Sequence, residues 1–125
     1  MEANRSILAI GLIPELVDFT TMPGMNAEKV RAGIVATNTK MAELGYDVHQ
    51  ALVDLGETAE AALTAQLAGR EFAGVVIGAG VRVIPAHLLL FEKIINLVHA
   101  KAPRARICFN THPGDTLEAV RRWVP

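Results

Sequence analysis

Apolar residues occur along the chain in short runs that are separated by stretches with helical spacing. Ser6 to Ile13 and Phe72 to Ile77 are continuous apolar runs. A continuous run, rather than an alternating one, is typical of a strand that is covered on both faces. Two more strands are predicted within Tyr46 to Leu55 and within Ala105 to Phe109.

The segments between these runs carry the signals of helices. The predicted helices begin near Asn26, Gly56, Pro85 and Asp115. Asn26 can cap the first of them, in which apolar residues from Val30 to Leu44 recur every three or four positions. Gly45 suits the left-handed position just past its end. Asp115 followed by Glu118 resembles a capping box at the start of the last helix.

Strands that alternate with helices, and that are themselves apolar, indicate a parallel sheet between two helical layers. We therefore expect one α/β domain over residues 1–125, a three-layer sandwich with a four-stranded parallel sheet. The predicted strand order is 2-1-3-4, which resembles a flavodoxin-like or Rossmann-like sheet with fewer strands.

Composition narrows the classes of partner. Hydrophobic residues make up 51% of the chain, the net charge is −1, and the 12 basic residues are dispersed, which argues against nucleic acid. The segment Leu88 to Ala100 is interrupted by polar residues and is too short to cross a membrane. The N-terminus does not resemble a secretion signal, and Cys108 is the only cysteine. These features predict a cytoplasmic protein without a membrane partner.

Polar residues are concentrated where the predicted strands end. In a parallel sheet these ends meet at one edge, and ligands bind in the crevice where the winding direction reverses. That crevice is expected between the loops after the first and third strands. The loops at this edge contain Glu15, Asp18, Thr20, Thr21, Asp54, Glu57, Gly78, Gly80, Arg82, His87, Asn110, Thr111, His112 and Asp115.

The loop after the third strand predicts an anion site. Gly78 and Gly80 allow the backbone to approach a ligand closely, and Arg82 can grip a carboxylate or phosphate. His87 and Asp18 complete the predicted ligand-binding set. The alternative is that the glycines form a tight turn and that the arginine is solvated.

The loop after the fourth strand predicts proton chemistry. His112 can act as a general acid or base near neutral pH, with Asn110 or Thr111 beside it as hydrogen-bonding groups. The alternative is a turn shaped by Pro113 and Gly114. The sequence leaves open whether any reaction is catalysed, and it identifies no cofactor.

Two further features point to a ligand. Asp18 and Asp54 end adjacent strands and offer carboxylate oxygens for a divalent cation, although no clustered metal motif accompanies them. The loop from Pro14 to Met25 is long and partly apolar, which suits either a lid or a cover for the core. The sequence contains neither the three-glycine fingerprint of dinucleotide-binding proteins after the first strand nor a Walker-type lysine loop.

The segment from Leu88 to Val98 carries apolar residues around most of the expected helix. This pattern predicts a homo-oligomer that uses the helix as its interface. Three hypotheses follow for function: a protein that binds or transforms a small anionic metabolite, a non-catalytic regulatory or assembly module, and a nucleotide- or flavin-binding protein.

Overall fold

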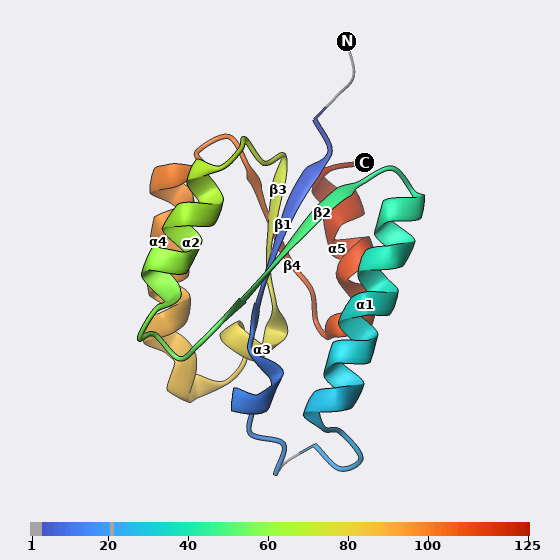
Figure 1. Ribbon diagram of the computed structural model, residues 1–125, viewed down its shortest axis with the longest axis vertical. Helices are drawn as coiled ribbons and strands as arrows, with labels where there is room; N and C mark the ends of the chain where they lie inside the picture. The colour runs from blue at the N-terminus through green and yellow to red at the C-terminus, as the bar shows by residue number, and fades with distance from the viewer. Residues whose placement is uncertain (1–3, 21) are drawn as a thin grey trace.

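The computed structural model describes residues 4–20 and 22–125, which fold around one parallel sheet (Figure 1). Its strands are β1 (Ser6–Leu12), β2 (Asp47–Val53), β3 (Gly74–Ile77) and β4 (Arg106–Phe109). The strand order is β2-β1-β3-β4, and every pairing is parallel. The predicted four-stranded parallel sheet with order 2-1-3-4 is therefore confirmed.

The helices form a layer on each face of this sheet. The described residues contain α1 (Ala27–Glu43), α2 (Ala59–Ala68), α3 (Ala79–Arg82), α4 (Leu88–Lys101) and α5 (Thr116–Trp123). Short 3-10 turns occur at η1 (Pro14–Leu16), η2 (Pro85–His87) and η3 (Pro113–Asp115). In Figure 1, α1 and α5 cover one face of the sheet, and α2 and α4 cover the other. The predicted three-layer arrangement is present.

Local capping signals fix the ends of α1 as predicted. The Asn26 side-chain oxygen accepts a hydrogen bond from the Lys29 backbone N–H at 2.9 Å. At the other end Gly45 adopts a φ of +91°, a conformation that a residue with a Cβ atom rarely takes.

The sequence did not predict the single helical turn α3 that follows β3. One expectation about local structure is wrong. The predicted capping box of Asp115 and Glu118 does not form, because the Asp115 carboxylate turns back to the N–H groups of Thr111 and His112. The capping box instead joins His112 to Asp115 within η3.

Side chains of β1 divide between the two faces of the sheet. Leu8, Ile10 and Leu12 belong to the core beneath α2 and α4, whereas Ile7 and Ala9 belong to the core beneath α1 and α5. Large residues thus fill the first face along the whole strand. Toward the carboxyl end of β1, the second face carries only the small residues Ala9 and Gly11. The space that they leave on this face is where the site lies.

Helix α4 packs against both the sheet and a neighbouring helix. Leu90, Ile94 and Val98 are buried in the core, and α2 lies alongside. The apolar residues left uncovered on α4 are Leu88 and Leu89, which are 61% and 75% exposed. No helix within residues 4–20 and 22–125 has the length and apolar character that a membrane crossing requires.

Candidate functional site

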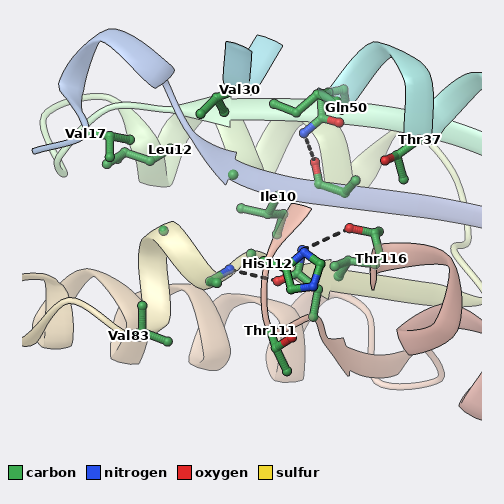
Figure 2. Close-up of a pocket in the computed structure, with 18 of the residues that line it drawn as sticks. Ile10, Leu12, Val17, Val30, Thr37, Gln50, Val83, Thr111, His112 and Thr116 are labelled. Atoms are coloured by element: carbon green, nitrogen blue, oxygen red, sulfur yellow. Dashed lines mark hydrogen bonds between the residues drawn. The ribbon is translucent and has the colours of Figure 1, made fainter. Parts of the chain in front are cut away.

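A cavity of about 270 Å³ opens at the carboxyl edge of the sheet (Figure 2). It lies on the α1 side, between the ends of β1 and β3, the loop that joins β1 to α1, and the segment that contains η3. The chain passes from β1 to α1 on one face and from β3 to α4 on the other. The cavity therefore occupies the predicted crevice where the winding direction reverses.

Small residues at the ends of the two central strands create this space. Ala9 and Gly11 of β1 and Gly78 after β3 line the floor. A Cβ atom at residue 78 would lie 3.2 Å from the Ile10 carbonyl oxygen, a tight contact, so glycine is favoured where β3 approaches β1. Gly78 and Gly80, two of the predicted ligand-binding residues, both line the cavity, the first as the N-cap and the second as part of the α3 turn.

Most of the wall is apolar. Phe19, Met22 and Met25 line the cavity from the loop between β1 and α1, and Val30 and Ile34 line it from α1. The long loop that the sequence marked as partly apolar is thus the outer wall of the cavity. Thr21 of this loop lies outside the described residues.

Asn110 closes one end of the cavity and is buried, with 6% of its surface exposed. Its side-chain oxygen accepts a hydrogen bond from the Ala79 backbone N–H at 2.9 Å, and its amide nitrogen donates to Thr116 Oγ1 at 2.9 Å. Figure 2 shows both bonds. Asn110 therefore joins the end of β4 to the starts of α3 and α5. Its side chain is a structural clamp within the cavity wall.

Beside Asn110, the side chain of Asp115 organises the following loop. Its carboxylate accepts hydrogen bonds from the backbone N–H groups of Thr111 at 2.9 Å and His112 at 3.2 Å, and from the Thr111 hydroxyl. Partial burial alone would raise the pKa of Asp115, but these bonds outweigh it and hold the pKa below its ordinary value. Thr111 and His112 are thus held at the cavity, which both residues line.

The tautomer of His112 follows from its neighbour. Its Nδ1 accepts a hydrogen bond from the Gly114 backbone N–H at 3.0 Å. In the neutral ring the proton must then be on Nε2. His112 is therefore arranged to offer an N–H donor to a ligand.

Gly114→Ala is expected to displace this ring, because a Cβ atom there would lie 2.9 Å from His112 Cε1. We expect the imidazole nitrogen chemical shifts to change from the Nε2–H pattern toward a mixture of tautomers, with stability lowered by about 1 kcal/mol or less. Long-range ¹H–¹⁵N NMR spectra measure this directly. Gly80→Ala is the control, since a Cβ atom there meets nothing within 4 Å. Unchanged His112 shifts in the Gly114 variant would contradict the assignment.

A second polar group of residues lines the cavity from α1 and β2, and sequence reasoning missed it. The Asn38 amide donates to Gln50 Oε1 at 2.9 Å, and Gln50 Nε2 donates to the Ala9 carbonyl oxygen at 2.8 Å. Figure 2 shows Gln50 and Thr37 across the cavity from His112. The sequence feature that could have indicated this group is Gln50, a polar residue within β2, which pairs with the apolar β1.

Arg82 lies outside the cavity. Its guanidinium donates to the Ile77 carbonyl oxygen at 2.6 Å and to the Asn110 carbonyl oxygen, and it stacks over the Phe109 ring at 4.7 Å. Through these hydrogen bonds Arg82 links the carboxyl end of β3 to the carboxyl end of β4. The structure does not bring Arg82 and His112 together around one ligand site.

Three other predicted residues, His87, Asp18 and Asp54, are not among those that line the cavity. His87 Nδ1 lies 3.2 Å from the Gly80 carbonyl oxygen. The Asp18 carboxylate accepts from the Thr20 backbone N–H at 2.9 Å, and the Asp54 carboxylate accepts from N–H groups at the start of α2. Among the described residues, no group of three or more His, Cys, Asp or Glu side chains is placed to hold a metal ion.

Cys108 is fully buried in β4, and burial raises the pKa of its thiol to about 11. A thiol with a raised pKa is a poor nucleophile at neutral pH, so Cys108 is a buried apolar residue of the core.

Comparison with known proteins gives no match, whether to family models, to curated proteins or to solved structures.

Proposed function

We propose that this protein binds a small organic molecule in the cavity between β1 and β3. The observation that carries the proposal is a cavity of about 270 Å³ whose walls are mostly apolar and whose polar groups stand at opposite ends. Small-molecule sites have this character, with apolar walls for affinity and a few hydrogen-bonding groups for orientation. Its position at the edge where ligands bind in open parallel sheets adds independent support.

Binding accounts for this site better than catalysis does. Among the lining residues that the structure describes, His112 is the single histidine, and no Asp, Glu, Lys, Arg, Cys or Tyr accompanies it. Asp115 accepts from the backbone of His112 rather than from its ring, so no carboxylate–imidazole pair is formed. If the protein is an enzyme, its chemistry is proton donation by His112, with Asn110 and Thr111 in supporting positions.

The expectation of an anionic metabolite depended on Arg82, which fastens the ends of β3 and β4 instead. Anion binding is therefore not part of the proposal. A nucleotide or flavin ranks lower still, because its phosphates need a cationic or N–H-rich cradle.

A flavodoxin-like relationship would rest on strand order alone. A cytoplasmic location remains a prediction from the lone buried cysteine.

A thermal-shift screen of small metabolites tests the proposal. A ligand that binds the folded protein raises its melting temperature by mass action. We expect uncharged, apolar compounds to raise it, and we expect a variant with a blocked cavity to lose the effect. A screen without hits, or hits that persist unchanged in the blocked variant, would contradict the proposal.

A separate proposal concerns assembly. Leu88 and Leu89 remain exposed at the amino-terminal end of α4, and Val83 is exposed at the end of α3. The exposed leucines favour a homo-oligomer that covers this end of α4. Light scattering at micromolar concentration is expected to give a dimer mass, and Leu89→Lys is expected to give a monomer. Ala100→Lys, at the other end of the same helix, is the control. A monomer mass for the unmodified protein would reject the proposal.

A further inference from the structure

The lining of the cavity carries little fixed charge. Among the lining residues that the structure describes there is no Asp, Glu, Lys or Arg. Two charged groups that neighbour lining residues are already engaged. The Asp115 carboxylate accepts from the backbone of Thr111 and His112, and the Arg82 guanidinium donates to the carbonyl oxygens of Ile77 and Asn110. A charged ligand would leave water without gaining a partner of opposite charge, which is unfavourable.

The volume sets the size of the ligand. An apolar cavity of about 150 Å³ in a protein accommodates a benzene ring. This cavity measures about 270 Å³, and it is bounded by side chains such as Val30, Ile34 and Met22. By proportion it accommodates about eleven non-hydrogen atoms, the size of two fused rings with a small substituent.

Polar groups then set the chemistry at the ends of the ligand. His112 keeps its proton on Nε2 in the neutral ring, because Nδ1 accepts from the Gly114 backbone N–H. The Asn38 and Gln50 amides line the opposite side, where they are bonded to each other and to the Ala9 carbonyl oxygen. The end at His112 thus offers a ring N–H donor to a hydrogen-bond acceptor, whereas Asn38 and Gln50 each already spend one amide N–H on a partner within the protein.

We infer that the ligand of this cavity is an uncharged molecule of two-ring size whose body is apolar and whose carbonyl-type acceptor is directed at His112. The inference rests on the proposed function, because it names the class of molecule that the same cavity binds. It differs from the anionic metabolite that the sequence predicts, and the difference arises from where the structure places Arg82.

A matched pair of probes tests this inference. 1-Naphthamide and 1-naphthoate have the same shape and differ in charge at pH 7. Titration calorimetry is expected to give a Kd for the amide that is lower than that for the carboxylate by about tenfold or more, since the carboxylate must be desolvated without a cationic partner. His112→Ala is expected to weaken binding of the amide by about threefold to tenfold and to leave naphthalene, which has no acceptor, unchanged.

The outcomes separate the ligand class from the site. Tighter binding of naphthoate within the cavity would overturn the class while leaving the site intact. The same conclusion follows if neither probe binds but a charged compound from the screen binds in the cavity. If no compound of either kind binds there, the proposed function itself fails, and the ligand class fails with it.

Discussion

Asn110→Ala is expected to lower the free energy of unfolding by about 3 kcal/mol. The substitution removes the acceptor of the buried Ala79 N–H and the donor to Thr116 Oγ1 in one step. It also removes an acceptor 3.4 Å from the Arg82 guanidinium. A buried N–H group that loses its partner costs about 1–3 kcal/mol, and the absent side chain leaves a void in addition.

Urea denaturation measures this loss, and Asn96→Ala is the matched control. Asn96 is an exposed residue of α4 whose amide donates to the Glu92 carbonyl oxygen at 2.9 Å. Its replacement is expected to change stability by about 0.5 kcal/mol or less, because water can replace the partner. Equal effects of the two substitutions would show that Asn110 does not clamp the end of β4 to α3 and α5.

Ile34→Trp is expected to weaken binding of any ligand in the cavity by about a hundredfold, which corresponds to about 2.7 kcal/mol. Ile34 lines the cavity from α1, and the larger indole ring takes the space that a ligand would occupy. Ile34 is half-buried and borders empty space, so the larger side chain can be accommodated without displacing the core. We therefore expect the free energy of unfolding to change by no more than about 1–2 kcal/mol. Titration calorimetry with 1-naphthamide measures the loss of binding.

The adjacent residue provides the control for this substitution. Val35 is 64% exposed on the same helix, so Val35→Trp adds the same ring without entering the cavity. We expect this variant to bind 1-naphthamide like the unmodified protein. Comparable losses in both variants would show that binding does not depend on the cavity.

Much of the fold could be predicted from the sequence because local signals agree with the global arrangement. The continuous apolar run of β1, the Asn26 cap and the left-handed Gly45 each fix an element independently. The cap of α5 could not be predicted in the same way. Asp115 suits both the helix that follows it and the loop that precedes it, and only the folded structure shows that its carboxylate turns to Thr111 and His112.

The position of the site was also predictable, whereas its chemistry was predictable only in part. Chain topology alone places the ends of β1 and β3 at one edge. The direction of a long side chain is decided by packing. Arg82 lies at the end of the α3 turn that follows β3, yet its guanidinium contacts carbonyl oxygens and the Phe109 ring and does not line the cavity. Gln50 is the opposite case. It lies in the middle of a strand and was not predicted as a site residue, yet it lines the cavity and accepts a hydrogen bond from Asn38 of α1.

Titration of the ¹⁵N-labelled protein with 1-naphthamide tests the central claim most directly. If the cavity between β1 and β3 is a binding site for uncharged two-ring molecules, amide shifts will change at Gly11, Gly78, Gly80 and Thr111, which surround it. Amides at the opposite edge of the sheet, such as those of Arg70 and Arg104, will stay unchanged. Shift changes confined to that opposite edge, or none at saturating concentration, would contradict the account.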